Sequence, residues 1–156
     1  MSDLIVVLTW FHIFSAVGWF GSFLYLLLVL FPLLGKMSPS GRGELMVKLL
    51  PPHARFTVIF GTLTVVFGGA LFLAMRAGES SAWLAYIETG IVFAFVAYVL
   101  MLWGEYGLHR MQRWMRSHSG ETPPGMGSPL LMVQLLVGFV TLTLAFTFMV
   151  LAAALG

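Results

Sequence analysis

The sequence predicts an all-α integral membrane protein, folded as a four-helix up-down-up-down transmembrane bundle. The 156 residues are 60% hydrophobic and only 9% charged, whereas a soluble domain carries about 25% charged residues. So few charges cannot cover a water-facing surface, and the apolar residues fall into four runs. Each run reaches the length of about 20 residues that a bilayer core requires. We therefore interpret residues 1–156 as a single transmembrane domain.

The sequence predicts four helices, at residues 4–34, 53–75, 82–108 and 129–155. The first is longer than a bilayer core requires, so it should tilt or protrude, and Pro32 is a natural place for it to bend or stop. The Pro51-Pro52 pair should separate a polar segment from the second helix. A basic loop rich in proline and glycine, 109–128, should separate the last two helices. Three short or moderate connections favour antiparallel packing of sequential neighbours.

The basic residues indicate how the bundle is oriented. Only Arg76 follows the second helix; the other Lys and Arg residues follow the first or the third, namely Lys36, Arg42, Lys48, Arg55, Arg110, Arg113 and Arg116. By the positive-inside rule, the two long loops should be cytoplasmic and both termini periplasmic or extracellular. We expect a multi-pass protein of the inner (cytoplasmic) membrane. Asp3 and the absence of a basic start and a cleavage site indicate a retained first helix, not a secretory signal.

The residue types present exclude several kinds of chemistry. The chain has no cysteine, so it offers no disulfide, thiolate metal site or cysteine nucleophile. The basic residues flank apolar runs and form no groove-reading motif, so we expect no nucleic acid partner. The sequence has no Gly-rich phosphate loop and no Ser-His-Asp set. Nucleotide chemistry and hydrolysis are therefore set aside.

One histidine, His12, lies well inside an apolar run, where an ionisable ring costs free energy unless it has a partner or a ligand. Sorting residues by helical rise places Glu88, Met149 and the Gly68-Gly69 pair at a similar depth in the other three helices. The four helices thus bring an imidazole, a carboxylate, a thioether and two residues without side-chain bulk to one outer layer. A flat or bulky cofactor would require such a gap.

The outer layer has two interpretations. In the first, it holds a haem or metal centre, with His12 as a ligand and Met149 or Glu88 completing the site, because imidazole and thioether are both haem axial ligands. In the second, a His12–Glu88 ion pair or hydrogen bond locks the bundle and Met149 fills a gap in the core. Gly68 and Gly69 would provide space for the ring of haem b in the first interpretation.

The opposite, inner layer is also polar. His53 and Arg55 open the second helix, Glu105 and His109 close the third, and Gln134 faces them from the fourth. His53 and His109 are a candidate second haem site, and Arg55 is a candidate partner for a haem propionate, an anionic lipid headgroup or Glu105. Alternatively, these side chains are solvated at the helix ends, where snorkelling is cheap.

Soft ligands follow the third helix. They are His109, Met111, Met115, His118 and Met126. Thioethers together with imidazoles suit Cu(I), which makes copper a second candidate cofactor. The alternative is a basic amphipathic segment on the membrane surface.

Three segments together resemble a known group of membrane proteins. His12 with Trp19-Phe20-Gly21, then 57–72 with its glycines, and then Trp83-Leu84 leading to Tyr98, resemble the copper-resistance-D-like proteins and the related HemJ-type protoporphyrinogen oxidases. The resemblance covers roughly residues 8–110. It implies a four-helix bundle that binds haem b through His12. The third-helix lysine that is thought to complete the HemJ-type site has no counterpart here, because Ile87-Glu88 stands in its neighbourhood.

We therefore carry three hypotheses about function. The first is a small b-type haem protein of redox type, with its site in the outer half of the bundle. The second is a cofactor-free structural or accessory subunit, because little of the chain lies outside the apolar runs; its partners would be other membrane subunits or further copies of itself. The third is a copper-handling membrane protein.

Overall fold

Every secondary-structure element of the computed structural model is helical within the described residues, which are 3–76, 80–117 and 129–154. The elements are α1 (Asp3–Tyr25), the π-helical turn η1 (Leu26–Leu30), α2 (Phe31–Lys36), α3 (Pro39–Met75), α4 (Ser81–Ser117) and α5 (Pro129–Ala153). Four stretches are long and apolar enough to cross a membrane: Asp3–Lys36, Gly41–Met75, Ser81–Gly107 and Val133–Ala153. The prediction of four apolar membrane-type helices is confirmed.

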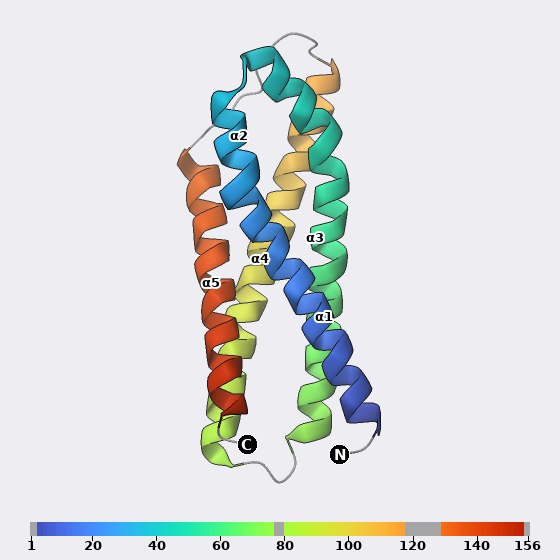
Figure 1. The fold of residues 1–156 in the computed structure, drawn as a ribbon, viewed down its shortest axis with the longest axis vertical. Coiled ribbons are helices and arrows are strands. Elements are labelled where there is room, and N and C mark those ends of the chain that lie inside the picture. Colours follow the sequence, from blue (N-terminus) through green and yellow to red (C-terminus); the bar gives the residue numbers. More distant parts are fainter. Residues whose placement is uncertain (1–2, 77–79, 118–128, 155–156) are drawn as a thin grey trace.

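The second long helix begins at Pro39, well before the predicted start at residue 53. Ser38 caps it, because its hydroxyl accepts from the Gly41 amide at 3.3 Å, and Pro39 occupies a first-turn position where no amide hydrogen is needed. Pro51 and Pro52 therefore lie inside α3. Figure 1 shows the first part of α3 crossing the end of the molecule before the helix turns alongside α1, as expected where prolines remove backbone hydrogen bonds.

The third long helix also exceeds its prediction. It was expected to end at residue 108, but α4 continues to Ser117. No proline or glycine occurs between Leu108 and Ser119, so nothing in the local sequence stops the helix. In the last turn, the Ser117 hydroxyl donates a hydrogen bond to the carbonyl of Trp114 at 2.9 Å.

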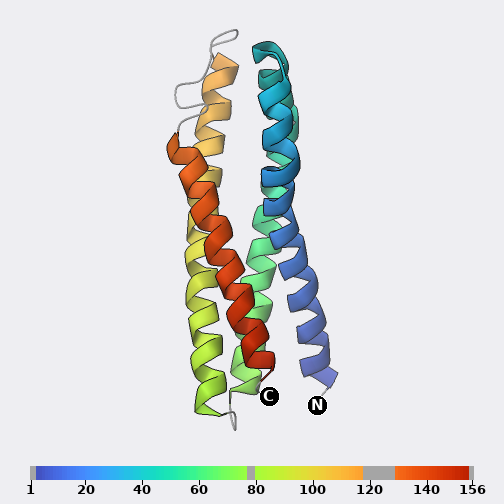
Figure 2. The same ribbon diagram turned by 60° about the vertical axis from the view of Figure 1, so that its left-hand side comes forward.

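The long helices are arranged as two pairs. α1 packs mainly on α3, and α4 packs mainly on α5; the pairs meet chiefly through α3 and α4, with a smaller contact between α1 and α5. Figure 2 shows the two pairs side by side, and Figure 1 shows both chain termini at the same end of the molecule. Space between the pairs is therefore the place to look for a site.

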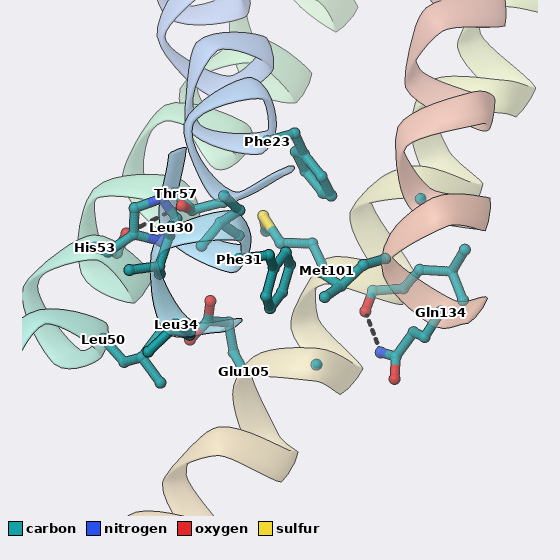
Figure 3. Close-up of a pocket in the computed structure, with 15 residues that line it drawn as sticks. Phe23, Leu30, Phe31, Leu34, Leu50, His53, Thr57, Met101, Glu105 and Gln134 are labelled. Atoms are coloured by element: carbon teal, nitrogen blue, oxygen red, sulfur yellow. Dashed lines mark hydrogen bonds between the residues drawn. The ribbon is translucent and has the colours of Figure 1, made fainter. Parts of the chain in front are cut away.

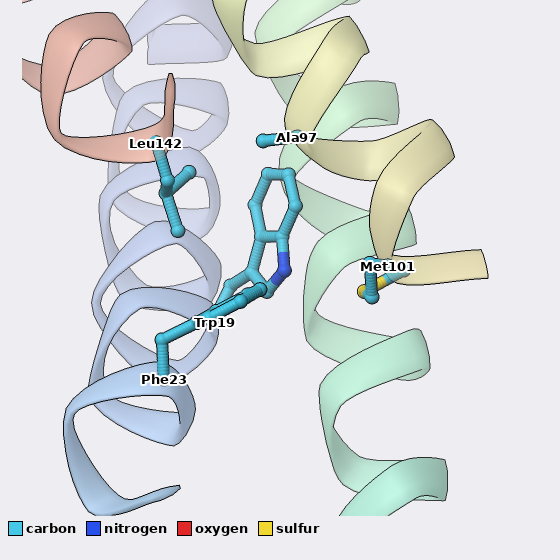
Figure 4. Packing of buried hydrophobic residues seen from close by; sticks show 5 residues of the cluster. All are labelled: Trp19, Phe23, Ala97, Met101 and Leu142. Carbon is cyan, nitrogen blue, oxygen red and sulfur yellow. The ribbon is translucent and has the colours of Figure 1, made fainter. Parts of the chain in front are cut away.

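A buried cluster joins the two pairs at mid-height. Its members are Trp19, Phe23, Ala97, Met101 and Leu142. The Trp19 side chain is fully buried and meets the Tyr98 ring edge-on at a centroid distance of 6.2 Å. Figure 4 shows the indole of Trp19 lying between Ala97 and Met101 of α4 and Leu142 of α5. This contact divides the interior into two halves.

The α1–α3 pair depends on one small residue. A Cβ atom at Gly18 would clash with the ring of Phe60, and that ring stacks on Phe56 at a centroid distance of 4.2 Å. We therefore expect Gly18→Ala to lower the free energy of unfolding by about 1–3 kcal/mol through overpacking. Thermal unfolding in detergent measures it. Gly21→Ala is the matched control, because a Cβ there meets nothing within 4 Å; equal stability of the two variants would contradict the prediction.

Candidate functional site

His12 of α1 is anchored to the backbone of α3. Its Nδ1 lies 3.1 Å from the carbonyl oxygen of Thr64. A carbonyl can only accept, so Nδ1 carries the proton and donates this bond. The neutral ring then keeps its lone pair on Nε2, which is the arrangement of imidazoles that bind metals.

Gly68 allows this anchoring. A Cβ atom at Gly68 would lie 2.7 Å from Cε1 and 2.9 Å from Nδ1 of His12. Side chains this close cannot coexist, so the imidazole occupies the space that the missing side chain leaves. Gly68 was predicted to provide space for a cofactor; its direct neighbour is the histidine ring.

A cavity of about 340 Å³ lies beside His12, toward the end of the bundle where the termini lie. We call it the outer cavity. All four long helices contribute to its lining, which is Thr9, His12, Ile13, Gly68, Leu71, Phe72, Met75, Trp83, Ile87, Ile91, Met149 and Ala153. Apart from His12 and Thr9 the lining is apolar, and the Thr9 hydroxyl donates to the Ile5 carbonyl at 2.8 Å. The imidazole is thus the one group in this lining with a basic nitrogen.

The structure brings three of the predicted outer-layer residues to this cavity: His12, Gly68 and Met149. Met149 packs on α4, where a Cβ at Gly90 would lie 3.4 Å from its Cγ. Glu88 is exposed and is not part of the lining. Gly69 is also exposed, and a Cβ there would meet nothing within 4 Å.

The predicted ion pairs do not form. Among the described residues the one salt bridge joins Lys48 to Glu44 at 2.7 Å, on the exposed face of α3. The His12–Glu88 and Arg55–Glu105 ion pairs that the sequence suggested are therefore not found among the described residues. Arg55 is exposed and lines neither of the cavities described here.

A second, smaller cavity of about 70 Å³ lies on the other side of the Trp19 cluster. We call it the inner cavity; Figure 3 shows its lining, which includes His53, Thr57, Glu105 and Gln134. His53 Nε2 lies 3.3 Å from the carbonyl oxygen of Ser22, so this ring nitrogen already has a hydrogen-bond partner. His109 is exposed and is absent from the lining. The structure therefore does not bring His53 and His109 to one cavity.

The structure describes little of the soft-ligand segment. His118 and Met126 lie outside the described residues, and the side chains of Met111 and Met115 are not described. Within the described parts of the chain, no three His, Asp or Glu side chains are grouped so that they could hold a metal ion. A copper site stays a prediction from the sequence.

Sequence reasoning missed part of the outer cavity. Trp83, Ile87 and Ile91 of α4 all line it. Their spacing of four residues places them on one face of a helix, so the signal was present in the sequence. Thr64 contacts His12 through its backbone carbonyl. Every residue has such a carbonyl, so the side chain at position 64 gives no sign of this contact.

Comparisons of the chain with protein-family models, with curated proteins and with solved structures found no match.

Proposed function

We propose that this chain is a b-type haem protein of the membrane, in which Nε2 of His12 would hold the haem iron and the outer cavity would receive the group. One observation carries the proposal: the imidazole is fixed by its Nδ1 bond to the Thr64 carbonyl and lines a cavity between two helix pairs. Metal-binding histidines typically donate their other ring nitrogen to a carbonyl or carboxylate in this way.

The residues present fit such a group. Haem requires one or two axial ligands from the protein, so the absence of a larger metal-binding cluster among the described residues does not bear against it. The cavity volume of about 340 Å³ falls within the roughly 300–1,000 Å³ typical of ligand sites. Met149 of α5 lines the cavity from the other helix pair and is the candidate second ligand.

The haem propionates require a cation or water. Neither Arg55 of α3 nor Arg76 at its end lines the outer cavity, but Arg55 lies well before Gly68, the first residue that α3 contributes to the lining. Arg76 is exposed and directly follows Met75, a lining residue at the end of α3. We assign Arg76 the role that the sequence interpretation gave to Arg55.

The chain's own residues would perform three tasks at this site. His12 holds the group from α1, and the Thr64 carbonyl fixes the orientation and tautomer of the ring. The apolar side chains of α3 and α4, among them Phe72 and Trp83, exclude water. When bound, haem supplies one-electron redox chemistry. The function proposed is electron transfer, or oxidation of a lipophilic substrate, in agreement with the resemblance to the copper-resistance-D-like and HemJ-type proteins.

The proposed setting is a four-helix up-down-up-down bundle in the cytoplasmic membrane. Four helices of sufficient length and apolarity support it, as does the position of both termini at one end (Figure 1). Seven of the eight Lys and Arg residues lie in α2, in the first half of α3 or in the last part of α4, toward the end of the bundle opposite the termini. This distribution supports a cytoplasmic location for that end. The outer cavity would then face the periplasmic or extracellular half of the bilayer.

An absorption spectrum tests the proposal directly. The chain is expressed with a haem supply, purified in detergent and measured in its oxidised and reduced forms. We expect a Soret band and, after pyridine treatment, the spectrum of haem b. A folded, purified protein without a Soret band would contradict the proposal.

Met149→Leu tests the second ligand. A methionine opposite histidine raises the reduction potential of haem, so its replacement by leucine should lower the midpoint potential while haem stays bound through His12. Redox titration followed by absorption measures this potential. Met101→Leu is the matched control, because Met101 is buried in the Trp19 cluster and does not line the outer cavity. Equal potentials in the two variants would exclude Met149 as a ligand.

A further inference from the structure

The inner cavity contains an acidic side chain in apolar surroundings. Glu105 of α4 lines it, and its Oε2 atom is buried without a hydrogen-bond partner among the described residues. Figure 3 shows the carboxyl group directed toward Leu34 of α2, to one side of the ring of Phe31. An ionised carboxylate in such a lining carries a large desolvation cost unless it is neutralised.

No basic side chain in the described part of the chain is placed to neutralise Glu105 by an ion pair. His53 is the other titratable residue of the lining; its Nε2 is against the Ser22 carbonyl and its ring stacks on Tyr25 at 5.8 Å. The remaining titratable groups whose side chains are described at this end are exposed or engaged elsewhere: Lys36, Arg42, Glu44, Lys48, Arg55, Tyr106, His109, Arg110 and Arg113.

Two other polar side chains of the cavity donate hydrogen bonds to backbone carbonyls. Gln134 of α5 donates from Nε2 to the Leu100 carbonyl at 3.0 Å, and the Thr57 hydroxyl donates to the His53 carbonyl at 3.0 Å. A metal cation such as Ca²⁺ or Mg²⁺ requires about six or more oxygen ligands, which this lining does not offer. A cavity of about 70 Å³ nevertheless exceeds the roughly 10–15 Å³ of accessible volume that a cavity needs to hold one water molecule. A proton delivered by water is therefore the ligand that fits.

We propose that Glu105 is a reversible proton-binding site within the membrane span, supplied by water in the inner cavity. In the binding step a hydronium ion gives its proton to the carboxylate, which leaves a neutral carboxyl group and a water molecule. Ionisable groups inside membrane spans mark proton relays in pumps and transporters. The proposal goes beyond haem binding in the outer cavity and does not depend on it.

Infrared spectroscopy of the purified chain in lipid tests the site. We expect a carbonyl stretching band of a protonated carboxyl group at neutral pH. The band should move when glutamate is replaced by ¹³C-glutamate, shift in D₂O because the proton exchanges with water, and disappear on alkaline titration. These measurements use the wild-type chain, so they stand even where a variant fails to fold.

Two variants assign the band to its residue. Glu105→Gln, nearly the same in shape, should lose the band entirely, whereas Glu88→Gln should retain it, because Glu88 is the exposed carboxylate of the same helix. No protonated-glutamate band in the wild-type chain at neutral pH would overturn the proposal. So would a band that neither exchanges nor titrates, or one that persists in Glu105→Gln. Since no haem is required, failure here is distinguishable from failure of the haem proposal.

Discussion

Replacing His12 by glycine should abolish the Soret band of the purified protein. The imidazole is the one strong ligand in the lining of the outer cavity. Its bond to the Thr64 carbonyl uses Nδ1, which leaves Nε2 as the nitrogen that can bind the haem iron. Loss of residues that merely orient a metal ligand costs about 10–100-fold in affinity, so removal of the ligand itself should cost more than about 100-fold. Haem titration followed by absorption measures the affinity.

Added imidazole separates ligation from a structural role. His12→Gly leaves space beside Gly68, so free imidazole should enter the outer cavity and restore the Soret band. A variant that had merely lost its fold would not be rescued. His53→Gly is the matched control, because His53 lines the inner cavity instead; it should keep the band. Full haem binding in His12→Gly without imidazole would contradict the assignment.

The apolar helices were predictable because hydropathy is a property of whole segments. Four stretches remain long and apolar enough to cross a membrane wherever their ends are placed. The ends themselves were not predictable from breakers alone. Pro51 and Pro52 lie inside α3, which starts at the Ser38 cap, and the residue just before them, Leu50, is buried against Leu30 and Leu34. α4, by contrast, runs on to Ser117 for lack of any breaker.

The site was predictable in depth but not in direction. A rise of about 1.5 Å per residue sorts residues along a helix, and His12, Gly68 and Met149, which this sorting puts at one level, line the same cavity. Neighbouring residues, however, point about 100° apart around the axis. Gly69 therefore faces outward although Gly68 meets His12, and Glu88 is exposed although Ile87 lines the cavity. The apolar stripe of Trp83, Ile87 and Ile91 would have shown which face of α4 is turned toward the cavity.

The division of the molecule into two cavities has a consequence for function. Trp19 is fully buried and separates the outer cavity from the inner one. His12 and Glu105 thus lie on opposite sides of the same aromatic contact, one in each half of the bundle. The haem site proposed at His12 and the proton site proposed at Glu105 are therefore separate sites, and each can be tested without the other.

Gly68→Ala should disturb the proposed ligand without touching it chemically. The new Cβ would lie 2.7 Å from Cε1 and 2.9 Å from Nδ1 of His12, so the imidazole must leave its bond to the Thr64 carbonyl. Overpacking of this kind costs about 1–3 kcal/mol in the free energy of unfolding. Separately, loss of the bond that orients the ring should lower haem affinity by about 10–100-fold, the usual effect of removing a partner of a metal ligand. Thermal unfolding and haem titration measure the two effects.

Gly69→Ala is the matched control, because it also replaces a glycine of α3 by alanine but adds the methyl group in another direction. The same substitution one residue along α3 adds a Cβ that meets nothing within 4 Å, and alanine is the better helix former. It should therefore leave haem affinity unchanged and stability equal or slightly higher. If Gly68→Ala and Gly69→Ala behave alike, the close approach of His12 to α3 is not what orients the ring. A difference between them would tie haem affinity to the position of His12 at the edge of the outer cavity, since the two variants share their chemistry and differ only in direction.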